Sequence, residues 1–203
     1  RERVKARVMM VALNAQIKSA LRYQRLLDCW IHCLACAVLT ESVAHGCGIP
    51  AERAYMAGLL HDVGRLGMMT AYPQEYARLL DVATEEGLPL IQAELDVFDI
   101  DHCMAGAWLA AEWNLPPEVR FVAQTHHEPP EAGDRELGNL LRITNRLTNL
   151  IGFSVMPEPD IYSFEDLVDM LPPSARRRIE PSQTALKQEI LEKVSVFAAP
   201  RAA

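Results

Sequence analysis

Residues 57–65 are Ala57-Gly58-Leu59-Leu60-His61-Asp62-Val63-Gly64-Arg65, which places a histidine and an aspartate side by side at the end of an apolar run. Neutral imidazole and carboxylate are ligands that zinc, iron, manganese and nickel accept from proteins. Consecutive residues on a helix diverge by about 100°. At a helix end, where the chain turns at Gly64, His61 and Asp62 can nevertheless point into one cavity. The doublet therefore predicts a ligand site where helices meet.

Four other histidines extend this pattern into other segments. His32 lies inside the preceding apolar segment, His102 begins a later one, and His126 and His127 end the segment after that. A single histidine is more often a satisfied core or surface residue than a ligand. Four separate helices that each supply one or two candidate ligands instead favour a metal site in the core of a helical bundle.

Apolar residues recur every three to four positions along most of the chain, which is typical of helices. The expected helices cover residues 4–21, 26–45, 51–60, 75–86, 91–97, 102–113, 117–127, 135–151 and 183–197. Ser163 and Asp166 have the spacing of a capping box and predict one further short helix. Segments with alternating apolar residues are missing. The fold class that we predict is all-α.

Length and composition exclude several classes of protein. The 203 residues are enough for one well-buried core, and half of them are apolar, which argues against disorder. A net charge of −7 argues against a nucleic-acid surface, because phosphate contacts dominate that affinity. We find no apolar stretch that approaches the roughly 18 residues needed to span a bilayer. The chain begins at Arg1, so residues ahead of it are expected to be missing.

The five cysteines are an odd number, which does not suit a disulfide framework and fits a reducing cytoplasm. Cys29, Cys33 and Cys36 have the spacing of the cluster motif in radical S-adenosylmethionine enzymes. That motif belongs on a loop after a strand, whereas this spacing lines one face of an expected helix. We therefore interpret the three as small buried thiols at a helix–helix contact. Glu94 is interpreted as a surface carboxylate rather than as a partner of a histidine.

Several motifs in this order resemble the HD superfamily. They are Trp30-Ile31-His32, the segment 57–65, His102 followed by Gly106, Trp113-Asn114-Leu115-Pro116, and His126-His127-Glu128-Pro129-Pro130. Within that superfamily they are similar to the HDOD domain, a relative of the HD-GYP cyclic-dinucleotide phosphodiesterases. The resemblance implies an HD-superfamily helical bundle with a histidine/aspartate pocket between helices. It covers about residues 1–155, and residues 156–203 are expected to form a C-terminal helical extension packed on the same domain.

The resemblance also implies a set of metal ligands. In the HD-GYP relatives seven positions hold two or three metals, and the residues that match them here are His32, His61, Asp62, His102, His126, His127 and Asn145. The relatives have an aspartate at the last position, and they carry a Gly-Tyr-Pro signature that is absent here. Because Asn145 brings no negative charge, the second of two ions would bind weakly.

We therefore expect one or two divalent transition-metal ions, which could be iron, manganese, zinc or nickel. The firm position is expected at the imidazoles of His102, His126 and His127 together with Asp62. The weaker position is expected near His32 and His61.

Two functions are open, and both follow from the resemblance. HDOD modules generally lie beside signalling domains, and many have lost metal ligands, so a regulatory domain that retains a metal site is slightly preferred because of Asn145. The alternative is an active metal-dependent phosphohydrolase or phosphodiesterase that acts on a nucleotide or cyclic dinucleotide. Asp62 would then bridge the ions and Arg65 would hold phosphate oxygens as the catalytic residues. Glu128 either orients the metal-bound water or one of the ligand histidines, or is a solvated loop carboxylate.

The candidate partners are a nucleotide or other phosphate ligand, other signalling domains or proteins, and further copies of the chain in a homo-oligomer. DNA and membranes are not expected as partners. The expected location is cytoplasmic.

Overall fold

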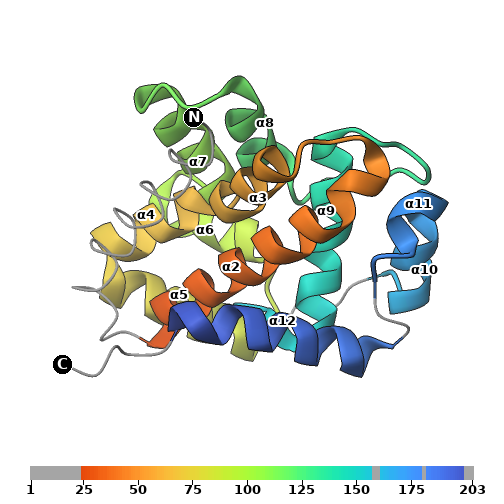
Figure 1. Ribbon diagram of the computed structural model, residues 1–203. Helices are drawn as coiled ribbons and strands as arrows, with labels where there is room; N and C mark the ends of the chain where they lie inside the picture. The colour runs from red at the N-terminus through yellow and green to blue at the C-terminus, as the bar shows by residue number, and fades with distance from the viewer. Residues whose placement is uncertain (1–23, 157–160, 180–181, 199–203) are drawn as a thin grey trace.

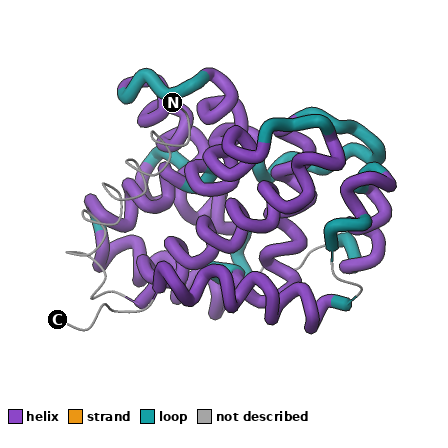
Figure 2. Tube along the Cα trace, in the orientation of Figure 1, coloured by secondary structure: helices purple, strands orange, loops and turns teal. Residues whose placement is uncertain are grey.

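Every regular element in the described part of the chain is a helix. The computed structural model describes residues 24–156, 161–179 and 182–198, and the helix expected at 4–21 lies outside them. Within these ranges Figure 2 shows helices joined by loops and no strand. The prediction of an all-α bundle is therefore confirmed.

The long helix α2 (Gln24–Ala44) is the central element of the bundle. Its buried side chains lie all round the helix, because α3 (Ala51–Leu60), α9 (Leu137–Thr148) and α12 (Gln183–Ala198) all pack against it. Figure 1 shows α2 crossing the bundle between α3 and α12. A helix that contacts neighbours on several sides must be apolar around its circumference.

That same composition corrects one expectation from the sequence. By length and hydropathy alone, the stretch Gln24–Cys47 would suffice to cross a membrane, so the statement that no apolar stretch approaches that length was wrong. In this fold 72% of the apolar 18-residue window within that stretch is buried. Burial against α3, α9 and α12 is enough to account for its apolar character.

The remaining helices follow in short succession. They are η1 (His45–Cys47), α4 (Val63–Ala71), α5 (Pro73–Glu86), α6 (Leu90–Phe98), α7 (His102–Glu112), α8 (Pro117–Thr125), η2 (Asn149–Phe153), α10 (Phe164–Met170) and α11 (Pro173–Arg176). Ser163 and Asp166 form the predicted capping box of α10. The C-terminal α12 packs on both α2 and η2, while the division of the chain near residue 155 stays a prediction.

Helix α4 was missed, because Gly64 was interpreted as a turn. Asp62 interrupts the helical path with φ −105° and ψ 22°, and a new helix starts immediately at Val63. The glycine serves a close contact between α4 and α7. A Cβ at position 64 would lie 2.0 Å from the carbonyl oxygen of His102 and 2.4 Å from the backbone nitrogen of Gly106. Without that Cβ, the two helices approach closely enough to bring Asp62 and His102 together.

Helix α9 continues into η2, a short stretch of π-helix. Gly152 inside it has φ 95°, a left-handed conformation that favours glycine. The wider turn presents the carbonyl oxygen of Phe153 to the Nδ1 atom of His32, 2.9 Å away on α2. The side chain of Gln183, on α12, donates a hydrogen bond to the carbonyl oxygen of Leu150. This segment therefore connects the C-terminal helix with a histidine of the predicted site.

Candidate metal centre

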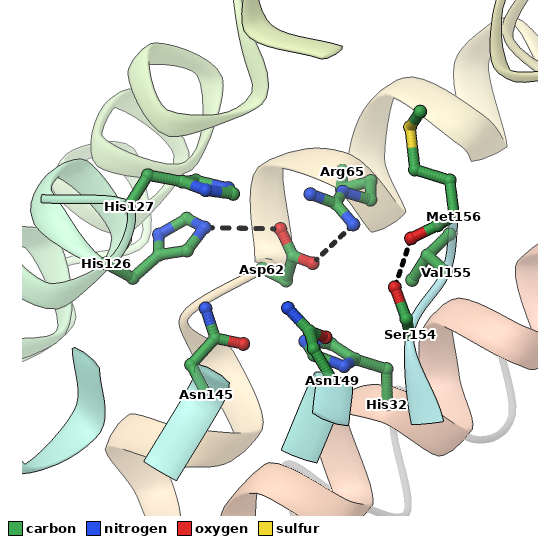
Figure 3. A pocket seen from close by; sticks show the side chains of 10 residues that line it. All are labelled: His32, Asp62, Arg65, His126, His127, Asn145, Asn149, Ser154, Val155 and Met156. Atoms are coloured by element: carbon green, nitrogen blue, oxygen red, sulfur yellow. Dashed lines mark hydrogen bonds and ion pairs between the residues drawn. The ribbon is translucent and has the colours of Figure 1, made fainter. Parts of the chain in front are cut away.

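The imidazoles of the five predicted ligand histidines meet around one aspartate in the interior of the bundle. The rings come from α2, from the α3–α4 junction, from the start of α7 and from the end of α8. They form two groups with ligand atoms close enough to share an ion: His102, His126 and His127 with Cys103, and His32 and His61 with Asp62. Figure 3 shows His126 and His32 on different sides of Asp62. The structure thus brings the predicted ligands together, whereas their roles stay predictions.

The first group is compact. The Nε2 atom of His102 lies 2.9 Å from Nε2 of His127 and 3.3 Å from Nε2 of His126. The Oδ1 atom of Asp62 lies 3.7 Å from Nε2 of His102 and 3.8 Å from Nε2 of His126. Three imidazoles and one carboxylate oxygen therefore face one small volume, as a metal centre requires.

The second group shares the same aspartate. The Nε2 atoms of His32 and His61 lie 3.2 Å apart. The rings of His61 and His126 are in edge contact, with centroids 5.0 Å apart, so the two groups adjoin. Asp62 adjoins both groups, and its predicted role as a bridge between two cations stays a prediction.

Hydrogen bonds at Nδ1 fix the orientation of four rings. The acceptors are the carbonyl oxygen of Phe153 for His32 (2.9 Å), of Gly58 for His61 (2.7 Å) and of Ala123 for His126 (3.0 Å), and the carboxylate of Glu94 for His102 (2.6 Å). These oxygens only accept, so Nδ1 carries the proton in each case. In a neutral ring Nε2 then holds a lone pair. Lone pairs that face each other at about 3 Å repel unless a proton or a cation lies between them.

Two of the predicted ligand side chains have buried oxygen atoms that accept no hydrogen bond. The Oδ1 atom of Asn145 and both carboxylate oxygens of Asp62 are buried without one, although Arg65 forms an ion pair with the carboxylate. An unsatisfied buried acceptor costs about 1–3 kcal/mol of stability, more for a charged group. Imidazole nitrogen, carboxylate oxygen and amide oxygen together fit a divalent transition metal. The residues present therefore fit the ion that the resemblance implies.

The ionisation states suit the same ligand. Burial is the main cause that lowers the pKa of His32 to about 3, and it also lowers the pKa values of His61, His126 and His127. Burial alone would raise the pKa of Asp62, but the charge of Arg65 and the adjacent rings hold it well below its usual range. These four imidazoles are therefore neutral beside an ionised carboxylate.

Glu94 was interpreted as a surface residue, and that interpretation was wrong. Its side chain is fully buried and accepts hydrogen bonds from Nδ1 (2.6 Å) and from the backbone nitrogen (2.9 Å) of His102. The hydroxyl of Tyr76 donates to its other oxygen. Burial lowers the pKa of His102, but hydrogen bonds with Cys103 and Glu94 outweigh this and raise it to about 10. A more basic imidazole is a stronger donor once a metal replaces the proton.

We predict that Glu94→Gln weakens metal binding by about 10–100-fold, because partners that orient a ligating histidine contribute that much. Competition titration with a chromophoric chelator measures the affinity. Asp96→Asn is the matched control, since Asp96 is exposed on the same helix and accepts only from Gln92 among the described contacts. Equal affinities of the two variants would show that Glu94 does not support the site.

The cysteines of α2 are buried, as predicted, but two of them also approach the centre. Cys29 and Cys33 have their sulfur atoms within 4.8 Å of each other and of a carboxylate oxygen of Asp62. A hydrogen bond to Cys29 and burial raise the pKa of Cys33 well above its usual value, so it stays a thiol. A thiol is a poor metal ligand compared with a thiolate. Cys36 contacts Thr40 instead.

A pocket of about 260 Å³, part of it open to solvent, leads to the centre. Its lining includes the predicted residues His32, Asp62, Arg65, His126, His127 and Asn145, and also Asn149, Ser154, Val155 and Met156, which the sequence did not indicate. Figure 3 shows Asn145 and Asn149 beside each other below Asp62. The four-residue spacing of the two asparagines on one helical face was the available signal.

Two predicted phosphate or metal partners have protein partners of their own. Arg65 lies 3.3 Å from Oδ2 of Asp62 through Nη1, and 3.2 Å from Nε2 of His102 through Nη2. Its proposed contact with phosphate stays a prediction. The carboxylate of Glu128 is largely exposed and pairs with Arg142, which agrees with its interpretation as a loop residue.

Comparisons of the sequence with known proteins identify its family and one relative. A family model of the HDOD domain matches residues 2–129. An uncharacterized protein of Treponema pallidum (strain Nichols) is 34% identical over 79 residues, which are 39% of this chain and 15% of that protein.

Two solved structures share the fold. A crystal structure of an HDOD domain protein with unknown function from Geobacter sulfurreducens has a TM-score of 0.60 and 22% identity, and it covers 85% of this chain and 60% of that chain. One from Shewanella amazonensis SB2B, described as a candidate phosphohydrolase, has a TM-score of 0.58 and 19% identity, and it covers 86% and 64%. The chain thus spans less than two thirds of these relatives.

Proposed function

Because this chain belongs to the HDOD domain family, we propose that it is a regulatory module of an intracellular signalling protein whose histidine–aspartate centre binds a divalent transition metal. The observation that carries the proposal is the convergence of ring nitrogens on Asp62. A bound ion would supply a positive charge at the base of the pocket. A phosphate group, for example of a nucleotide, could then be recognised by that charge without being hydrolysed.

Asn145 supports binding over hydrolysis. Its amide oxygen lies in the pocket where the hydrolytic relatives have a carboxylate, so the centre has Asp62 as its single pocket-lining carboxylate among the described residues. A pair of divalent ions needs more negative charge than one carboxylate supplies. The proposal extends to a cytoplasmic location, in which the five free cysteines would remain reduced.

The second candidate function is metal-dependent phosphodiester hydrolysis. It is favoured by the retention of Asp62 and the five histidines at one centre, which a pocket lined by Asp62 and three of those histidines connects to solvent. A resident ion would act as a Lewis acid toward a phosphoryl oxygen. Residues that line the pocket, such as His127 and Asn149, would orient the phosphodiester.

The experiment loads metal-free protein with Fe²⁺, Mn²⁺ or Zn²⁺ and measures bound metal by mass spectrometry. We expect at least one ion per chain, and a rise in melting temperature with inorganic phosphate only in the loaded protein. Hydrolysis of a generic phosphodiester and of cyclic dinucleotides should equal that of the His61→Ala, Asp62→Ala double variant. Turnover above that variant would favour the hydrolase instead, and a protein that binds no ion would contradict both functions.

A further inference from the structure

Arg65 places a fixed positive charge inside the candidate metal centre. It lies in the first turn of α4, three residues after Asp62, and only 7% of its side chain is exposed. Its two terminal nitrogens face protein atoms of the centre, Oδ2 of Asp62 and Nε2 of His102. A buried guanidinium is always charged, because its pKa lies above about 12.

The two oxygens of Asp62 face different cation positions. Oδ1 is turned toward the rings of His102 and His126, at 3.7 Å and 3.8 Å. Oδ2 is turned toward Nη1 of Arg65 at 3.3 Å. Figure 3 shows the contacts with His126 and Arg65 on two sides of the carboxylate. A carboxylate that bridges two metals offers one oxygen to each, and here the guanidinium is paired with one of them.

The charges of the buried groups also favour a single divalent ion at the centre. With His102 neutral, as a metal ligand must be, the buried charged groups are two carboxylates, Asp62 and Glu94, and one guanidinium, Arg65, with a net charge of −1. One divalent ion changes this to +1, whereas a second ion would leave +3 in a buried volume. Asn145 adds no compensating charge.

The second imidazole pair is also within the field of Arg65. The ligand nitrogens of His32 and His61 lie within 4.8 Å of a carboxylate oxygen of Asp62, and Arg65 pairs with that carboxylate at 3.3 Å. The fixed positive charge of the guanidinium therefore disfavours a further cation between these two rings.

We infer that Arg65 takes the place of the second metal: its guanidinium occupies the Oδ2 side of Asp62 and holds the centre at one divalent ion, bound by His102, His126, His127 and Oδ1 of Asp62. An ion at His102 would displace the Nη2 contact, while the Nη1 contact involves the other carboxylate oxygen. The inference rests on the proposed function, since it presupposes that the centre binds metal.

Metal stoichiometry in the wild type and three variants tests this inference. Apo protein is dialysed to equilibrium against excess Mn²⁺, and bound manganese per chain is measured by mass spectrometry. We expect one ion in the wild type, one in Arg65→Lys, which keeps the charge, and two in Arg65→Met, which removes it. Arg142→Met is the matched control and should bind one, because Arg142 contacts Glu128 and the backbone of Thr125 outside the centre.

Electron paramagnetic resonance adds a second readout, and its result for the wild type does not depend on the folding of any variant. The wild type should show the hyperfine pattern of isolated Mn²⁺, and Arg65→Met should show the pattern of an exchange-coupled pair. Two coupled ions in the wild type, or a single ion in a folded Arg65→Met protein, would overturn the role of Arg65 and leave the metal-binding function intact. A wild type that binds no ion would overturn both.

Discussion

Asp62→Asn should abolish metal binding while the five imidazoles stay in place. Asp62 is the one carboxylate shared by both ligand groups, and Oδ1 lies within 4 Å of two ring nitrogens. Asparagine keeps the shape of the side chain and removes its charge. We expect the affinity to fall by more than about 100-fold, since even a partner that only orients a ligand contributes about 10–100-fold. Chelator competition and metal analysis after gel filtration measure this loss.

The same substitution leaves Arg65 buried without its counterion, which costs about 3–5 kcal/mol of stability. Loss of metal could then follow from loss of structure. The double variant Asp62→Asn, Arg65→Met separates these effects, because it removes both charges of the pair. It should recover most of the free energy of unfolding in urea and should still bind no metal. Wild-type affinity in either variant would exclude Asp62 as a ligand.

Gly64→Ala should be the most destabilising conservative substitution in the centre. The added Cβ would lie 2.0 Å from the carbonyl oxygen of His102 and 2.4 Å from the backbone nitrogen of Gly106. Backbone atoms of a packed helix cannot move aside without separating α4 from α7. We expect the free energy of unfolding to fall by about 4 kcal/mol or more, at the upper end of single substitutions. Because α4 follows Asp62 and α7 begins with His102, metal affinity should fall as well.

Gly67→Ala provides the control on the same helix. A Cβ at position 67 would meet only the Cδ1 atom of Leu109, at 3.0 Å, and that flexible side chain can give way. The higher helix propensity of alanine, worth up to about 1 kcal/mol, offsets the contact. Urea unfolding should therefore show a near-neutral change for Gly67→Ala. A similar loss for both glycines would mean that backbone flexibility, rather than the α4–α7 contact, determines the effect.

The histidines that meet at the centre could be identified because each lies at a helix end or on a helix whose limits the sequence marks. His102 follows the capping aspartate at position 101, and His126 precedes a proline-rich loop. Asn145 could be placed because the motif order fixed the helix on which the last ligand belongs. These features depend on local sequence, and local sequence determines helix limits.

Other features depend on how helices meet, which local sequence does not encode. Glu94 is a carboxylate on a short helix, and its contacts with α5 and with the start of α7 bury it. Glycine is a residue typical of turns, yet Gly64 lies inside α4, where that helix approaches the backbone of α7 closely. Arg65 was predicted to hold phosphate, and its contacts with Asp62 and His102 became visible only when the junction was folded.

The π-helical segment η2 connects the pocket with the C-terminal helix through hydrogen bonds at both of its ends. Its carbonyl at Phe153 anchors the ring of His32, and its carbonyl at Leu150 receives the side chain of Gln183. A rotation of the imidazole on ligand entry would therefore pull on the backbone that supports α12. If a domain follows α12 in a longer chain, ligand binding in the pocket would displace the backbone that connects to it, without direct contact between that domain and the ligand.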